Sequence, residues 1–470
     1  SGIRGINLDQ SSIKTLTNKG TIEASLNGIN FYATDGSSGE IMKLGKIILG
    51  NGSSIKARNN GININNGASK AIEADGIEVQ KGASISGDNA GIYIGGKKEI
   101  NAQIKIEGTV TGGKAGIVNE GIIGNGSSSS GSTGGIIISG GSVNSSSGGS
   151  GIVNQGNGSI LGDIKVESGA QVEGGLVNTG NGSILGEIKV ENGGSVEGGI
   201  TNTGNGSISG SITVASGGKL DSITNTSSSS TGISGSITNN SDNNLEISNG
   251  VGATIGGGIV NNGDADLIIS NQGSVGKDSN GNTVTNNGSG KVGIKNWLVT
   301  TDKNTGKLDT VVVGGNTKGN IKVDKITVDQ SDLNLDELSD INNIISGVNQ
   351  RSIGNIGTNG GGEISLSYDP LTSKLTTDFN LNASISGAIF RSLISTSTRR
   401  STFIDNVMGN SMQSFYLGNS SRAQRIAMSE KGNLYANASD YIKSDLNRGA
   451  YGSNKEHSLF ILPYASSQNV

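Results

Sequence analysis

The residues that could do chemistry are sparse in this 470-residue chain, and they lack the spacing that an enzyme needs. The single histidine, His457, lies in an apolar C-terminal segment, and no Gly-x-Ser-x-Gly motif accompanies it to build a Ser-His-Asp triad. No Gly-Lys-Ser or Gly-Lys-Thr occurs, so a phosphate-binding loop is missing, and we interpret Gly156-Asn-Gly158 as a turn. We therefore predict no catalytic residue, no cofactor and no metal ligand.

Acidic residues gather densely in one place, just after residue 328. A solvated helix face is our preferred interpretation of this group, and a calcium site is the alternative. Elsewhere the acids are interleaved with lysine, whereas a β-helical polysaccharide-degrading enzyme needs clustered carboxylates on one face. The group consists of Asp329, Asp332, Asp336, Glu337 and Asp340.

Asparagines recur after pairs of residues that begin with an apolar one. Asn tolerates the left-handed conformation of a sharp bend, and stacked side-chain amides can hydrogen-bond to one another. We therefore predict a structural Asn ladder; a ligand-binding row would require the amides to face solvent. The ladder would comprise Asn154, Asn178, Asn202, Asn225, Asn239 and Asn261, with Asn119 as an earlier member.

A 24-residue repeat positions these asparagines. Gly151-Ile-Val-Asn-Gln-Gly-Asn-Gly-Ser-Ile-Leu-Gly returns almost unchanged from Gly175, and a third copy begins at Gly199. A unit of this length cannot bury its own apolar face, so neighbouring units must stack. The alternation Ile164-Lys165-Val166 predicts strands with apolar residues inward. We expect an all-β fold, a right-handed parallel β-helix of about 14 coils and roughly 65 Å.

Composition agrees with a repetitive rod. The chain has 80 Gly, 2 Pro, no Cys and 3% aromatic residues, which is too few large side chains for several globular cores. The regular Ile and Val spacing argues against disorder. A net charge of −4 without a basic stripe disfavours nucleic-acid binding. The lack of thiols is consistent with export. Without an initiator Met or signal peptide, we expect a mature chain or an excised piece.

Composition also changes near residue 330, where arginine and phenylalanine become frequent. After it we predict a helix from 333 to 345, with Asp332 as N-cap and Leu338, Ile341 and Ile345 on one face. A hairpin of Glu363–Pro370 and Lys374–Leu381 follows. The expected segments are a rod over 1–330, a cap over 331–382, a helical part over 383–456 and an apolar strand over 457–470.

The final segments carry a family resemblance. A Gly/Asn/Ser-rich solenoid, a helical segment with Thr398-Arg-Arg-Ser-Thr-Phe-Ile-Asp-Asn-Val-Met and a trailing apolar strand resembles the passenger and junction of an autotransporter (type V secretion), especially those of Campylobacter and Helicobacter. Residues 385–465 carry the motif-like part. The resemblance implies an autochaperone-like 331–382, a pore or linker helix over Ala383–Leu417, and 457–470 as the start of an outer-membrane barrel that is otherwise missing here.

The resemblance also implies a function. We expect a non-enzymatic, surface-exposed passenger, anchored in the outer membrane through that barrel, that acts in adhesion, aggregation or virulence. Its partners would be a host-cell surface protein or glycan, a second passenger, and the barrel with its assembly machinery, but no nucleic acid. The Gly-Asp-Ser-Gly motif of protease passengers does not occur. The alternatives are a β-helical polysaccharide-degrading enzyme and an inert surface spacer.

Overall fold

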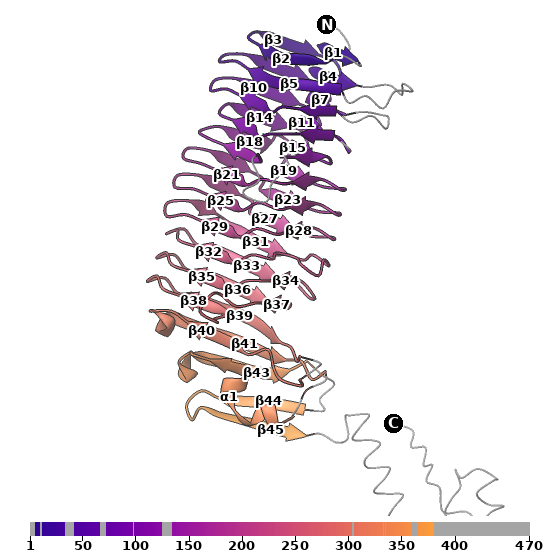
Figure 1. Cartoon of the computed structure of the whole chain (residues 1–470). Helices are drawn as coiled ribbons and strands as arrows, with labels where there is room; N and C mark the ends of the chain where they lie inside the picture. The colour runs from indigo at the N-terminus through magenta and orange to yellow at the C-terminus, as the bar shows by residue number, and fades with distance from the viewer. Residues whose placement is uncertain are drawn as a thin grey trace, which may run out of the picture. The chain divides into compact units, whose positions relative to one another are not determined.

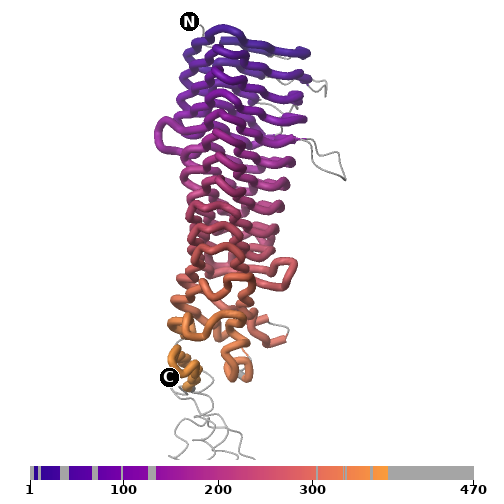
Figure 2. The backbone as a smooth tube through the Cα atoms, turned by 90° about the vertical axis from the view of Figure 1, so that its left-hand side faces the viewer, coloured from indigo at the N-terminus to yellow at the C-terminus, as the bar shows by residue number. Residues whose placement is uncertain are grey.

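The strands of this protein wind repeatedly about one axis. In the computed structural model, the coils lie one below another from the indigo N-terminal end to the orange end (Figure 2). The solenoid has about 12 turns and very little helix. The described residues are 5–9, 12–32, 42–65, 72–96, 98–124, 134–302, 305–331, 333, 335–359 and 364–379.

Sheet A is the 14-stranded sheet, and its strands follow one another in chain order down the rod (Figure 1). Neighbouring strands such as β19, β23 and β27 pair in parallel, as stacking of successive coils requires. Its strands are β1 (Ile6–Asp9), β4 (Ile29–Tyr32), β7 (Asn60–Ile64), β11 (Ala90–Ile94), β15 (Ala115–Asn119), β19 (Ser150–Asn154), β23 (Leu176–Asn178), β27 (Ile200–Asn202), β31 (Ser222–Asn225), β33 (Leu245–Asn249), β36 (Leu267–Asn271), β39 (Val292–Val299), β41 (Ile321–Val328) and β43 (Ile353–Thr358).

Sheet B has 19 short strands, often two from one coil. They are β2 (Ile13–Asn18), β5 (Met42–Leu49), β8 (Ile72–Ala74), β9 (Ile77–Val79), β12 (Lys98–Ile100), β13 (Ile104–Ile106), β16 (Ile122–Ile123), β17 (Ile136–Ile138), β20 (Ser159–Ile160), β21 (Ile164–Val166), β24 (Ser183–Ile184), β25 (Ile188–Val190), β28 (Ser207–Ile208), β29 (Ile212–Val214), β32 (Ile237–Asn239), β35 (Ile259–Asn261), β38 (Val284–Asn286), β40 (Val311–Gly314) and β42 (Ile345–Ser346). A separate pair consists of β34 (Thr254–Ile255) and β37 (Ser274–Val275).

Sheet C has eight strands and accompanies only the first part of the rod. It ends at residue 220, so the later coils lack this wall. Its strands are β3 (Thr21–Ala24), β6 (Ser54–Ala57), β10 (Ser84–Gly87), β14 (Thr109–Gly112), β18 (Ser142–Ser145), β22 (Gln171–Glu173), β26 (Ser195–Glu197) and β30 (Lys219–Leu220).

The core consists of rows of identical or similar apolar side chains. Ile164 pairs in register with Ile188, which pairs with Ile212, and all three are buried. Lys165, between Ile164 and Val166, lies on the outer face, as the alternation predicts. Because each side chain stacks on its equivalent one coil away, the repeat itself supplies close packing.

Glycine closes the corner between sheet A and sheet B. Gly156, Gly180 and Gly204 occupy equivalent positions in three successive coils, with φ of +64°, +66° and +64°. A residue with a Cβ is strained in this left-handed conformation. The corner therefore repeats with the sequence period.

The predicted helix from 333 to 345 is replaced by two shorter pieces, the 3-10 helix η2 (Leu335–Ser339) and α1 (Ile341–Ile344). Asp340 divides them, because its backbone is extended and its Oδ1 accepts a hydrogen bond from the Asn342 N–H at 2.9 Å. Asp340 is thus the N-cap of α1, whereas Asp332 lies outside the described residues. Leu338, Ile341 and Ile345 are nevertheless buried.

Sheet A does not stop near residue 330. After β41 the chain forms η2, α1 and η3 (Gln350–Ser352) and then returns to sheet A as β43. The predicted hairpin is present as β44 (Ile364–Asp369) and β45 (Lys374–Phe379), in a separate two-stranded sheet. The predictions for 383–456 and 457–470, including the junction helix, lie outside the described residues.

Candidate interaction surface

Buried asparagines form a continuous hydrogen-bonded row at the ends of the sheet A strands. Each side-chain amide donates to the Oδ1 of the asparagine in the next coil, over 2.7–3.0 Å. We call this row the sheet A ladder. Its members are Asn119, Asn154, Asn178, Asn202, Asn225, Asn249 and Asn271.

Asn239 and Asn261 do not belong to this row, although the repeated apolar-x-Asn pattern predicted them there. They end strands of sheet B, where Asn239 donates to Asn261 at 3.1 Å and Asn261 donates to Asn286 at 3.0 Å. Asn239 pairs in register with Val214 of the preceding coil, so an amide occupies a position that is apolar one coil earlier. The predicted single ladder is therefore two ladders in different sheets.

The amides of the sheet A ladder also hold their own corners. The side-chain amide of Asn178 donates to the carbonyl oxygens of Gly182 at 3.1 Å and Ser207 at 3.2 Å, in addition to Asn202. Because Asn178 is buried and its amide is shared among three acceptors, it cannot reach a ligand outside the rod. These asparagines are structural rather than ligand-binding.

Several ladder members were missed at the level of sequence. Asn249, Asn271 and Asn286 each follow an apolar residue by two positions, so the same triplet could have identified them. A further short row links Asn63, Asn30 and Asn7 near the N-terminal end. Its donors point toward the preceding coil, which a triplet pattern cannot indicate.

The described acids after residue 328 accept hydrogen bonds from backbone N–H groups. Asp329 Oδ1 accepts from the Ser331 N–H at 3.1 Å, and Glu337 Oε2 accepts from the Leu308 N–H at 3.4 Å. Asp336 and Glu337 lie in the first turn of η2. Within the described residues, no group of three or more His, Cys, Asp or Glu side chains has metal-binding geometry.

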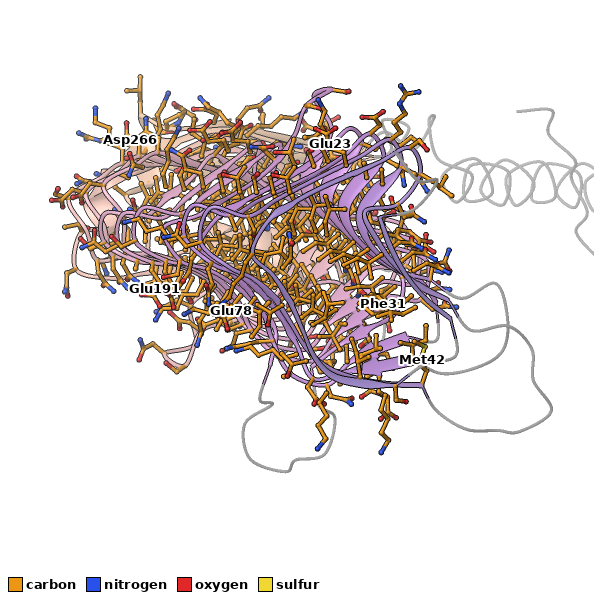
Figure 3. All side chains as sticks on the ribbon, turned by 90° about the horizontal axis from the view of Figure 1, so that it is seen from above. Glu23, Phe31, Met42, Glu78, Glu191 and Asp266 are labelled. Carbon is orange, nitrogen blue, oxygen red and sulfur yellow. The ribbon has the colours of Figure 1, made fainter. Side chains whose placement is uncertain are left out.

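Several charges on the outer face of sheet B are paired. Lys105 lies 2.6 Å from Glu107, and Lys189 lies 2.9 Å from Glu191. The hydrogen bond from Lys189 to Glu191 raises the pKa of the lysine. Glu78 and Glu191 are partly exposed, whereas Phe31 is buried in the core; Figure 3 labels all three. Where lysine and acid are paired, this face is locally neutral and has little field to select a charged partner, whereas Glu73 and Glu99 stack as like charges.

The outer edge of sheet C carries hydroxyl groups at one position of five successive coils. Parallel pairing places these residues side by side at the strand spacing of about 4.8 Å. We call them the hydroxyl column: Thr21, Ser54, Ser84, Thr109 and Ser142. The Ser142 hydroxyl is 3.4 Å from that of Thr109, and Ser54 is equally far from Thr21. Such long contacts leave hydrogen-bonding capacity for a partner.

A second exposed row occupies the corner turns between sheets A and B. The side-chain amide of Asn205 donates to Asn181 at 3.2 Å, and Asn181 donates to Asn157 at 3.1 Å. These amides lie outside the rod, one coil apart. Together with the hydroxyl column, they make the surface polar, periodic and poor in net charge.

Known proteins give no further guidance. No protein-family model, curated protein or solved structure matches this chain. None of the helices in the described part of the chain is both long and apolar enough to cross a membrane. His457 lies outside the described residues. The candidate interaction surface is therefore assigned from the positions of its hydroxyl and amide groups alone.

Proposed function

We propose that this chain is the surface-exposed passenger of an autotransporter and acts in adhesion through an extended polar face. A parallel β-solenoid rod is consistent with such a passenger. The hydroxyl column is the observation that carries the proposal, because it repeats one donor and acceptor group along the rod. In this proposal the rod is held at the outer membrane by a barrel.

The proposed mechanism is distributed contact. Each hydrogen bond from a surface hydroxyl contributes only about 0.5–1.5 kcal/mol net. Stacked coils hold such groups at fixed spacing, so a partner that meets several of them loses little further entropy.

We also infer a right-handed coil, because parallel strand connections overwhelmingly have that hand.

The test is display of residues 1–470 on bacteria by fusion to a complete outer-membrane barrel, with the barrel alone as control. Attachment to epithelial cells is scored against clumping of the bacteria. We expect attachment that requires the rod. If bacteria carrying the rod neither attached nor clumped more than the control, the proposed function would be wrong.

Two matched sets of substitutions would locate the binding face. In the first, Ser54→Ala, Thr109→Val and Ser142→Ala remove hydroxyls of sheet C. In the second, Thr201→Val, Thr224→Val and Ser248→Ala remove an in-register row from the outer face of sheet A. We expect only the first set to reduce attachment. If both sets reduced attachment equally, sheet C would not be the specific binding face.

Self-association is a second candidate, and the paired charges of sheet B favour it. Since Lys105, Lys165 and Lys189 each have an acidic neighbour, two copies lying side by side would meet little like-charge repulsion. In the same display experiment, clumping without attachment to epithelial cells would support this candidate over adhesion to a host surface.

A further inference from the structure

Within the rod, one corner between sheets B and C is shorter than those of the adjacent coils; the first coil has an equally short one, where Lys19 and Gly20 connect β2 with β3. Between sheets B and C, four residues connect β9 with β10, and four connect β21 with β22. Only Glu107 and Gly108 connect β13 with β14. The four-residue turns of later coils stack on one another, since the Gly169 N–H donates to the Gly193 carbonyl oxygen and the Gly193 N–H donates to the Gly217 carbonyl oxygen, both at 3.0 Å. The ridge of turns is therefore interrupted at Glu107.

The connection between β13 and β14 lies close against the preceding coil. The N–H groups of Glu107 and Gly108 both donate to the Val79 carbonyl oxygen, at 2.7 and 3.1 Å. A Cβ at Gly108 would lie 2.2 Å from the Ala83 carbonyl oxygen, so only glycine allows this approach. The missing turn leaves a hollow of about 340 Å³ on the surface. We call it the corner notch; its side-chain groups come from Lys81, Ser84, Glu107, Thr109, Ser142 and Gln171.

The lining of the corner notch is polar and close to neutral. Ser84, Thr109 and Ser142 are the consecutive hydroxyl-column members that line it, each one coil from the next. Neither the Ser84 hydroxyl nor the Gln171 amide has a hydrogen-bond partner among the described residues. The lining has one cation, Lys81, and one anion, Glu107, whose carboxylate also lies 2.6 Å from Lys105 Nζ. An apolar ligand would leave the hydroxyl and amide groups unpaired, and an ion of either sign would meet a like charge as well as an opposite one.

We propose that the corner notch binds a neutral saccharide unit. A sugar ring carries several hydroxyl groups that both donate and accept, as the lining does, and the volume has room for a short oligosaccharide. The strand spacing of about 4.8 Å sets the distance between successive lining hydroxyls. The inference rests on the proposed function and deepens it, because it assigns a place and a ligand class to adhesion.

The chain offers a direct way to fill the corner notch. Inserting Ser-Gly between Glu107 and Gly108 restores a four-residue turn of sequence Glu-Ser-Gly-Gly. Asn192→Ser is the matched control, since it produces the same four residues over Glu191–Gly194, where the ridge is already continuous. Thr109→Val is a milder second variant, which removes one lining hydroxyl and keeps a β-branched residue in β14.

The experiment measures binding of the full chain and these variants to an array of neutral and acidic oligosaccharides. We expect the unmodified chain and Asn192→Ser to bind neutral oligosaccharides, with about a tenfold loss for Thr109→Val and no binding after the insertion. If the unmodified chain bound no neutral oligosaccharide, or if the insertion left binding unchanged, the inference would be overturned.

The display experiment separates this inference from the proposed function. If attachment to epithelial cells persisted after the insertion, the proposed adhesive function would stand, but the corner notch would have no part in it. Clumping that is lost on insertion, with no saccharide binding, would instead assign the corner notch to a second copy of this chain and overturn the saccharide. Loss of attachment both on insertion and after enzymatic removal of cell-surface glycans is the result that we expect.

Discussion

The side-chain amide of Asn178 donates to the Oδ1 of Asn202 at 2.8 Å, inside the rod and one repeat away. Asn178 in turn accepts from Asn154 at 2.7 Å, so each buried amide joins the coil before it to the coil after it. At the corner, the side-chain amide of Asn178 also donates to the carbonyl oxygens of Gly182 and Ser207. A buried polar row of this kind stabilises only if all its members are paired.

Removing one member should therefore be costly. We expect Asn178→Ala to lower the free energy of unfolding by about 1–3 kcal/mol, because Asn154 loses an acceptor and the Gly182 and Ser207 carbonyls lose a donor. The measurement is urea unfolding followed by far-UV circular dichroism. Asn181→Ala is the control, since Asn181 belongs to the exposed row and is open to water. Equal effects at the two positions would contradict a structural role of the buried ladder.

Glycine beside the ladder should resist substitution for a packing reason. A Cβ at Gly182 would lie 2.5 Å from Asn178 Oδ1 and 2.8 Å from the Asn154 carbonyl oxygen. We expect Gly182→Ala to destabilise the rod by about 1–3 kcal/mol, through overpacking. At Gly20 a Cβ would meet no atom within 4 Å, so Gly20→Ala should leave the unfolding midpoint nearly unchanged. If Gly182→Ala left the unfolding midpoint unchanged, the ladder asparagines would have shifted to make room for the added methyl group.

Neighbouring residues of one repeat should differ sharply in their contribution to stability. Ile184 is fully buried in the core, whereas the next residue, Leu185, is 48% exposed. We expect Ile184→Ala to cost about 2–5 kcal/mol and Leu185→Ala much less, because only the first leaves a cavity. Thermal unfolding of the two variants beside the unmodified chain measures this difference. A larger loss for Leu185→Ala would mean that its outer face is covered by another part of the protein.

Two glutamates of sheet B should respond to pH with opposite sign. Glu99 stacks in register on Glu73, and burial together with the Glu73 charge raises its pKa in the folded chain. The folded state then binds a proton more readily than the unfolded state, so stability falls as pH rises through the raised pKa. We expect Glu99→Gln to stabilise the rod at pH 7 by about 0.5 kcal/mol, with the gain vanishing below about pH 4.

Glu78 provides the counterpart. Hydrogen bonds from Lys46 and Gln80 lower its pKa, so its contribution to stability is present above the unfolded pKa and is lost as pH falls through the lowered one. Glu78→Gln should destabilise the rod at pH 7 and have little effect in acid. Urea unfolding at a series of pH values tests both variants. Parallel pH profiles for the two would contradict the assigned environments.

The sequence by itself determined the architecture of this protein. A 24-residue period with apolar residues at alternate positions implied stacked parallel strands, and it correctly put Ile164 and Val166 inside and Lys165 outside. Glycine at equivalent turns indicated the corners. These properties are local, since alternation and turn conformation depend on residues within a few positions of one another.

Tertiary structure alone decided which equivalent residues meet. Asn225 and Asn239 follow the same apolar-x-Asn pattern, yet one ends a strand of sheet A and the other a strand of sheet B. The extended backbone at Asp340 interrupted a helix that periodicity had extended to 345. The corner notch arises because two residues connect β13 with β14, whereas four connect β9 with β10 and three connect β17 with β18. Contacts between coils depend on the residue count of every intervening turn, and a repeat pattern does not specify that count where the repeat is imperfect.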